Sequence, residues 1–298
     1  MSDRWVGVLG ASSLVGAYLL PQLATAGWQV QAFSRQAERM GAIKAEGITW
    51  HSPAGKSNAD NPVMTCADWI SLAPIWVLSQ YFSWMAACGA RRVVAVSSTS
   101  RWVKTASSDP AERLLAERLA GGEQELTDWA SQNKIEWIIL RPTLIYGDGR
   151  DRNISSIARF IQRFGFFPLL GEGRGLRQPI HAREVAIACR QVLTAQHIAN
   201  RAYEISGGET LSYRNMVCRV FEALGRHPRI VSVPLWCFRL AAAGAQLLPP
   251  FRNLSTAMAE RMNQDLVFDH SAASQDWGFT PGPFRPNFDV YRDPFDKP

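Results

Sequence analysis

The stretch VGVLGASSLVG, residues 6–16, joins a short apolar run to a glycine and places a second glycine six residues further on. The run from Trp5 to Leu9 predicts a buried strand, and Gly10 predicts a tight turn. A helix follows, because apolar residues then recur on one helical face at Leu14, Val15, Tyr18, Leu19 and Leu23. A strand, a glycine turn and a helix N-terminus together favour an anion, since free N–H groups and the helix dipole point at it. A structural turn without a ligand is the alternative.

Strands and helices alternate along the first 150 residues. Further strands are predicted at 28–33, 48–50, 68–72, 91–98 and 135–140, and helices at 36–46, 74–88 and 110–132. Several strands are apolar on consecutive residues, which is typical of strands covered on both faces. We therefore expect an α/β fold, a doubly wound parallel sheet with a smaller, mostly helical C-terminal lobe. The apolar run 234–248 predicts a core helix or a partner surface, and the Pro-rich 280–298 predicts coil.

Composition narrows the class of protein. The chain has 298 residues, 47% of them hydrophobic, and a net charge of +6 that comes from arginine. No run approaches the roughly 18 apolar residues of a membrane span, and a strand starts almost at residue 1, so we expect neither a membrane partner nor a signal peptide. The absence of charge blocks and nucleic-acid motifs favours an anionic or carbonyl small molecule over nucleic acid, with a merely basic surface as the alternative.

Cysteine usage favours a reducing, cytoplasmic location. The five cysteines lie far apart and form no C-x-x-C pair, so we expect no metal site and no disulfide framework. They are Cys66, Cys88, Cys189, Cys218 and Cys237.

The end of the second predicted strand bears on the cofactor. An enzyme that binds NAD usually places Asp or Glu there to bind the ribose hydroxyls. Here the sequence reads AFSRQ, with neutral Ser34 followed by Arg35, which could pair with a 2′-phosphate. This favours NADP over NAD, with a solvated charge at a helix start as the alternative for Arg35.

Four stretches resemble the extended branch of the short-chain dehydrogenase/reductase superfamily, the NAD-dependent epimerase/dehydratase family. They are the G-x-x-G-x-x-G turn, here Gly10, Ser13 and Gly16, and the segments VVAVSSTS (93–100), LRPTLIYGDGRD (140–151) and RQPIHAREVA (177–186). The resemblance implies a Rossmann-type dinucleotide-binding domain from 1–150 and 176–207, with a substrate lobe from 151–175 and 208–298. Relatives that pair through two long helices also imply a homodimer.

Site residues follow from the resemblance. Thr99 matches the catalytic Ser/Thr of the family, with Ser98 beside it, and Tyr146 would line the cleft. The residues expected at the dinucleotide are Gly10, Ser12, Ser13, Leu14, Val15, Gly16, Ser34, Arg35, Ser97, Pro142 and Thr143. Arginines of the lobe would bind a substrate diphosphate, and Arg174 with Arg177 is the favoured pair.

The family's reaction needs Tyr-x-x-x-Lys, in which the lysine lowers the tyrosine pKa and holds the ribose. Residues 101–129 contain no tyrosine, and their one lysine, Lys104, precedes the helix. Aligning GGEQEL (121–126) with the Glu-containing stretch of the family places Leu115 and Leu119 at the two positions.

Two interpretations stay open. The chain is an oxidoreductase or a nucleotide-sugar epimerase-like enzyme acting on a hydroxyl or carbonyl compound, in which Thr99 polarises the carbonyl and His181 or Tyr146 supplies the proton. Alternatively, it binds NADP without turnover, as a sensor, scaffold or assembly factor. A structural role is the alternative for both His181 and Tyr146.

Overall fold

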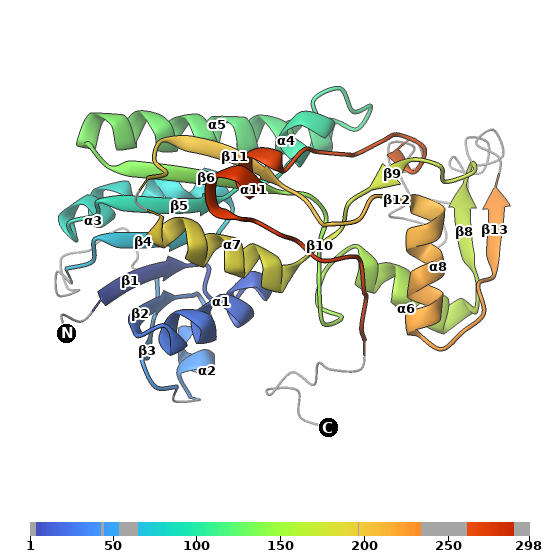
Figure 1. The fold of residues 1–298 in the computed structure, drawn as a ribbon, viewed down its shortest axis with the longest axis horizontal. Coiled ribbons are helices and arrows are strands. Elements are labelled where there is room, and N and C mark those ends of the chain that lie inside the picture. The colour runs from blue at the N-terminus through green and yellow to red at the C-terminus, as the bar shows by residue number, and fades with distance from the viewer. Residues whose placement is uncertain (1–3, 43–44, 54–64, 196, 234–260, 289–298) are drawn as a thin grey trace.

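The computed structural model describes residues 4–42, 45–53, 65–195, 197–233 and 261–288 (Figure 1). The predicted helix over 234–248 lies outside these residues, as does the end of the predicted C-terminal coil.

A seven-stranded parallel sheet forms the centre of the larger part of the molecule, in the order β11-β6-β5-β4-β1-β2-β3. Its strands are β1 (Arg4–Leu9), β2 (Trp28–Phe33), β3 (Ile48–His51), β4 (Asp68–Ser71), β5 (Arg92–Val96), β6 (Glu136–Pro142) and β11 (Arg201–Ile205). The chain moves outward from β1 in one direction through β2 and β3, then returns to β4 on the other side. This confirms the doubly wound sheet and places a topological switch point between β1 and β4, where such sheets bind their ligands.

Helices cover both faces of the sheet (Figure 1). On one face, α1 (Leu14–Thr25) and α7 (Ala182–Thr194) pack on Val6, Val8 and their neighbours. On the other face lie the 3-10 helix η2 (Ile75–Tyr81), α3 (Phe82–Ala87) and α5 (Pro110–Asn133). The consecutive apolar residues of the strands are thereby explained, because alternate side chains enter two different cores.

Shorter helices connect these elements. They are α2 (Ala37–Gly41), α4 (Ser100–Val103) and α11 (Ser271–Trp277). The single helix predicted over 74–88 is instead a 3-10 turn followed by α3. Its first residues, IWV, have low helix propensity because branched and aromatic side chains lose rotamer freedom in a helix.

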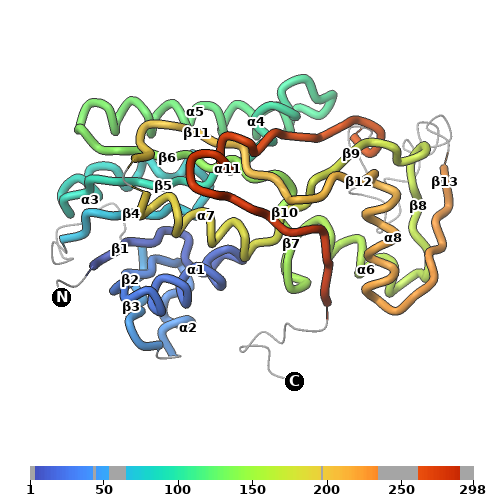
Figure 2. The backbone as a smooth tube through the Cα atoms, in the orientation of Figure 1, coloured from blue at the N-terminus to red at the C-terminus, as the bar shows by residue number. Residues whose placement is uncertain are grey.

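A smaller lobe holds the third core cluster, which is centred on α6 (Ile154–Phe164) and α8 (Tyr213–Ala223). Three short strand pairs surround these helices. They are β7 (Ile145–Tyr146) with β10 (Ile180–His181), β8 (Phe167–Leu170) with β13 (Ile230–Val233), and β9 (Leu176–Arg177) with β12 (Leu211–Ser212). After α11, residues 279–288 run without helix or strand from the sheet toward this lobe (Figure 2).

Two glycines shape the turn between β1 and α1. Gly10 has φ +70°, in the left-handed region that other residues avoid, and a Cβ there would lie 2.6 Å from the backbone nitrogen of Ala73. A Cβ at Gly16 would lie 2.0 Å from the carbonyl oxygen of Ala11. Gly16 is therefore required because the first turn of α1 packs directly on the backbone of the turn.

We expect Gly16→Ala to lower the free energy of unfolding by about 3 kcal/mol or more, because the new methyl group meets backbone that cannot move independently. Urea denaturation measures the change. Gly121→Ala is the matched control, since a Cβ at Gly121 in α5 has nothing within 4 Å. It should stabilise the protein by about 0.5–1 kcal/mol, and equal losses in both variants would contradict the assignment.

Candidate functional site

The start of α1 lies at the carboxyl edge of β1, beside the switch point. Ser13 is the N-cap, and its Oγ accepts a hydrogen bond from the Gly16 N–H at 3.1 Å. The first backbone bond of the helix runs from the Ala17 N–H to the Ser13 carbonyl, so the N–H groups of Leu14 and Val15 precede the helical ladder. Ser12, Ser13 and Leu14 are all half-exposed, which leaves this helix start open to a ligand.

The end of β2 is joined to the glycine turn by two hydroxyl groups. Ser12 Oγ lies 2.7 Å from Ser34 Oγ, which also accepts a hydrogen bond from the Gln36 N–H at 3.0 Å. Ser34 is buried and Arg35 is exposed beside it. No carboxylate therefore stands at the end of β2, and the first charged group there is a cation.

The ends of β5 and β6 bring four of the predicted residues together. Thr99 bonds to the Pro142 carbonyl twice, through its N–H at 3.1 Å and its Oγ1 at 3.2 Å. Thr143 Oγ1 donates to the Gln178 carbonyl at 2.5 Å. Thr99 and Thr143 are buried, whereas Ser98 is half-exposed and its Oγ accepts from the Ser100 N–H.

A buried carboxylate that the sequence reading did not identify lies next to these residues. Glu123 of α5 is 2% exposed and accepts hydrogen bonds from Ser97 Oγ at 2.6 Å and from the guanidinium groups of Arg101 and Arg141. Arg141 bonds in turn to Glu204 of β11 at 3.0 Å. Burial alone would lower the pKa of Arg141, but the hydrogen bonds and charges of the two glutamates raise it above its usual value.

One signal in the sequence could have identified this network. Glu123 stands four residues after Leu119 and three before Leu126, so its place on the helix is that of a core residue. A carboxylate at such a position needs buried cations, and Arg141 in the motif LRP is one of them.

A second group of predicted residues meets on the short β7–β10 strand pair. The Tyr146 hydroxyl accepts a hydrogen bond from the Arg285 N–H at 3.1 Å, and its ring packs edge-on against His181 at 5.0 Å. Tyr146 is 4% exposed. His181 is the N-cap of α7: its Nδ1 accepts from the Arg183 N–H at 3.1 Å, and Glu184 accepts from the His181 N–H. Burial lowers the pKa of His181, which keeps the ring neutral and able to accept this bond.

The positions aligned with the catalytic tyrosine and lysine are occupied by core side chains. Leu119 is 4% exposed within the cluster between α5 and the sheet, and Leu115 packs against the same cluster. Helix α5 contains no tyrosine or lysine along its whole length, which the structure describes. Lys104 pairs with Glu112 at 3.4 Å. The structure thus offers no Tyr–Lys pair on this helix.

The two lobe arginines proposed for a diphosphate do not form a pair. Arg177 is 4% exposed, and its guanidinium donates to the carbonyl groups of Leu176, Gln264 and Arg261. Burial lowers the pKa of Arg177 to about 10. Arg174 is exposed and pairs with Glu172. The Arg177 donors are already used by the chain's own backbone, so we leave this residue out of the proposed ligand site.

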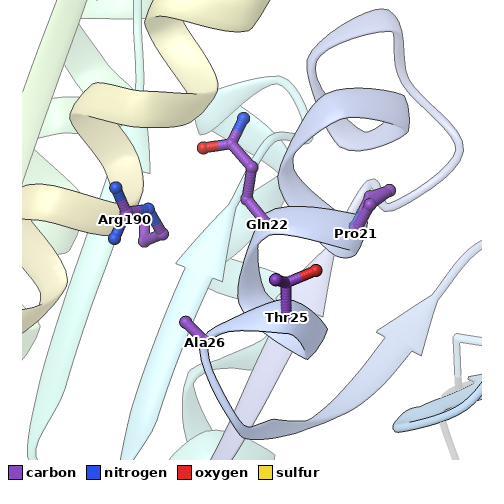
Figure 3. A pocket seen from close by; sticks show the side chains of 5 residues that line it. All are labelled: Pro21, Gln22, Thr25, Ala26 and Arg190. Carbon is purple, nitrogen blue, oxygen red and sulfur yellow. The ribbon is translucent and has the colours of Figure 1, made fainter.

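The described residues also show one hollow away from the glycine turn. A small hollow lies between α1 and α7, lined by Pro21, Gln22, Thr25, Ala26 and Arg190 (Figure 3). It sits at the end of α1 and therefore on the opposite edge of the sheet from the glycine turn. The described residues hold no group of three or more His, Cys, Asp or Glu side chains suited to a metal ion. None of the helices among them is long and apolar enough to cross a bilayer.

The middle of the chain matches a protein-family model. Residues 80–206 match the NAD dependent epimerase/dehydratase family. This confirms the resemblance predicted from the sequence motifs.

Individual relatives match this chain over only part of their own length. UDP-glucose 4-epimerase from Vibrio cholerae is 26% identical over 121 residues, which make up 40% of this chain and 36% of that protein. The NADH dehydrogenase [ubiquinone] 1 alpha subcomplex subunit 9 from Arabidopsis thaliana mitochondria is 27% identical over 109 residues, 36% of this chain and 27% of that protein. The matched segments thus span about a third of these relatives.

The fold matches over nearly the whole chain. UDP-glucuronic acid 4-epimerase from Bacillus cereus, solved with UDP-glucuronic acid and NAD, superposes with a TM-score of 0.71 and 13% identity. The superposition covers 93% of this chain and 94% of that one. At this identity the likeness establishes the fold alone.

We expect Glu123→Ala to lower the free energy of unfolding by about 3–5 kcal/mol, because Arg101 and Arg141 would lose the buried carboxylate that neutralises them. Urea denaturation measures the loss. Glu125→Ala, which removes an exposed carboxylate two residues along the same helix, should change stability by no more than about 0.5 kcal/mol. A Glu123→Ala protein as stable as this control would contradict the assigned network.

Proposed function

Since residues 80–206 match the NAD dependent epimerase/dehydratase family, we propose that the chain binds a nicotinamide dinucleotide at the start of α1. The observation that carries the proposal is the open first turn of this helix at the switch point between β1 and β4. Backbone N–H groups and the helix dipole favour a pyrophosphate there. The residues proposed to surround it are those predicted from the sequence, namely Gly10, Ser12, Ser13, Leu14, Val15 and Gly16.

The proposed dinucleotide is NADP. Ser34 and Ser12 present neutral hydroxyl groups where a carboxylate would repel a 2′-phosphate, and Arg35 is exposed beside them. Arginine suits a phosphate because its planar guanidinium donates two parallel hydrogen bonds. The Bacillus cereus epimerase was solved with NAD, so NAD is the competing ligand to be tested.

Titration of the protein with NADPH and with NADH tests the proposal. We expect saturable binding of both and tighter binding of NADPH. Arg35→Ala should weaken NADPH binding about 10-fold or more, because one charge-assisted hydrogen bond contributes about 1.5–3 kcal/mol, and should leave NADH binding nearly unchanged. Arg118→Ala, which removes an exposed arginine on α5, is the matched control. An equal loss for both dinucleotides would contradict the role of Arg35, and no binding of either would contradict the proposal as a whole.

In this proposal the protein binds or senses the dinucleotide and does not carry out the proton transfer of the family's reaction. In the bound state the dinucleotide would supply a hydride donor or acceptor, but Leu115 and Leu119 cannot exchange the accompanying proton. The similarity to the NADH dehydrogenase subunit favours such a role. That relative is named as one subunit of a larger assembly, so it is a precedent for a similar segment within a multi-subunit complex.

A second candidate function is favoured by the similarity to UDP-glucose 4-epimerase. In this proposal the chain acts on a nucleotide-sugar or a related carbonyl compound held between the sheet and the lobe. Ser98 and Thr99 would contact the reacting oxygen, while Tyr146 or His181 would have to exchange the hydrogen bonds described above for contacts with the substrate.

Two assays separate the two candidates: NADPH absorbance with simple carbonyl compounds, and chromatographic detection of the epimer formed from sugar nucleotides in the presence of the oxidised dinucleotide. The second assay is needed because epimerisation returns the hydride to the sugar and leaves NADPH absorbance unchanged. We expect no turnover, and we expect Thr99→Ala to bind NADPH as the parent protein does. Turnover that Thr99→Ala reduces at least about 100-fold, with NADPH binding retained, would instead establish the enzyme.

A further inference from the structure

One side chain of α1 ties the proposed dinucleotide site to the smaller lobe. Tyr18 follows Leu14 by four residues, so it lies one helical turn behind the N–H groups proposed to hold the pyrophosphate. Its hydroxyl donates a hydrogen bond to the carboxylate of Asp148, which is 130 residues further along the chain. Asp148 belongs to the connection between β7 and α6, the first helix of the lobe.

The connection has an unusual backbone. Gly147, Asp148 and Gly149 have φ values of +157°, +50° and +69°. A non-glycine residue in the left-handed region is uncommon, and aspartate adopts it more readily than most residues. The Asp148 carboxylate is therefore presented to α1 by a specific backbone conformation.

The same connection controls the beginning of α6. Asp151 accepts hydrogen bonds from the N–H groups of Asn153 and Ser155, at 2.9 and 3.2 Å, and from the Ser155 hydroxyl at 2.6 Å. Only two residues separate Asp148 from this capping group. Asp148 and the group that caps α6 therefore belong to one short stretch of backbone.

The Tyr18 side chain is itself restrained. Its ring packs edge-on against His181 at 5.4 Å, and the Arg183 guanidinium lies over it at 5.4 Å. Burial, followed by the hydrogen bond to Asp148, raises the pKa of Tyr18 well above its usual value. The hydroxyl therefore keeps its proton, and remains a donor, throughout the pH range in which proteins are studied.

We propose that Tyr18 is a positioning residue: a dinucleotide bound at the first turn of α1 orders residues 147–155 through the Tyr18–Asp148 hydrogen bond. The inference rests on the proposed dinucleotide site. It adds a direction to that site, because the start of the lobe becomes better ordered once the dinucleotide is in place.

Hydrogen–deuterium exchange of residues 147–155, with and without saturating NADPH, tests the inference. In the parent protein NADPH should slow exchange of this segment about fivefold or more, as expected for a coupling of the usual size. In Tyr18→Phe the gain in protection should fall to less than twofold, while NADPH still binds at the glycine turn. The gain is the informative quantity, because a purely structural role would change the two states equally.

The chain offers a matched control. Tyr203 of β11 donates to the Asp276 carboxylate at 2.5 Å, in a Tyr–Asp pair remote from the 147–155 segment. Tyr203→Phe should keep the full NADPH-dependent gain. Asp148→Asn tests the pair from its other side, and the weaker neutral acceptor should leave a gain between those of the parent and Tyr18→Phe.

The outcomes separate this inference from the proposal on which it rests. Absence of NADPH binding to the parent protein overturns the proposed function and this inference together. Normal NADPH binding with an undiminished gain in Tyr18→Phe overturns the inference alone. An equal fall in Tyr18→Phe and Tyr203→Phe also overturns it, because the effect would then be general loosening of the fold.

Discussion

The arrangement of the site depends on how closely α1 approaches the turn that precedes it. With no side chain at Gly16, the helix packs on the Ala11 carbonyl, and its N-terminus is held at the edge of β1. That edge lies beside the switch point between β1 and β4, where the strand order changes direction. The N–H groups of the first turn of α1 therefore lie at the place where such sheets bind their ligands. The Ser12–Ser34 hydrogen bond then fixes β2 to the same turn.

A buried charge network on α5 organises the neighbouring strand ends. In this helix the family's reaction would require a tyrosine and a lysine, but the chain has leucines that extend the core. One turn further on, Glu123 joins β5 through Ser97 and β6 through Arg141. The positions of these strand ends are thus set by buried ion pairs and do not depend on a Tyr–Lys pair in α5.

Much of the fold could be predicted from the sequence because its signals are local. Consecutive apolar residues in 28–33 and 135–140, and Asp109-Pro110 at the start of α5, are read directly from neighbouring residues. The pairings that build the site are not local. No residue near Tyr146 in the sequence predicts that its hydroxyl accepts a hydrogen bond from the Arg285 N–H. Likewise, the motif around Arg177 does not predict that backbone carbonyls from 261–264 accept its hydrogen bonds. Charge and spacing describe the capacity of Arg174 and Arg177 to bind an anion, whereas burial and the backbone carbonyls around Arg177 decide how many of its donors are available.

The path of residues 279–288 has a consequence for how the molecule assembles. The Gly282 N–H of this segment donates to the Glu184 carboxylate at the start of α7, Phe284 packs in the core of the lobe, and the Arg285 N–H donates to the Tyr146 hydroxyl. During synthesis, the contacts around Tyr146 therefore stay incomplete until residue 285 has been added, although the first strands of the sheet are made long before. Because these contacts join residues so distant in sequence, the segment completes the lobe only after its other elements have been synthesised.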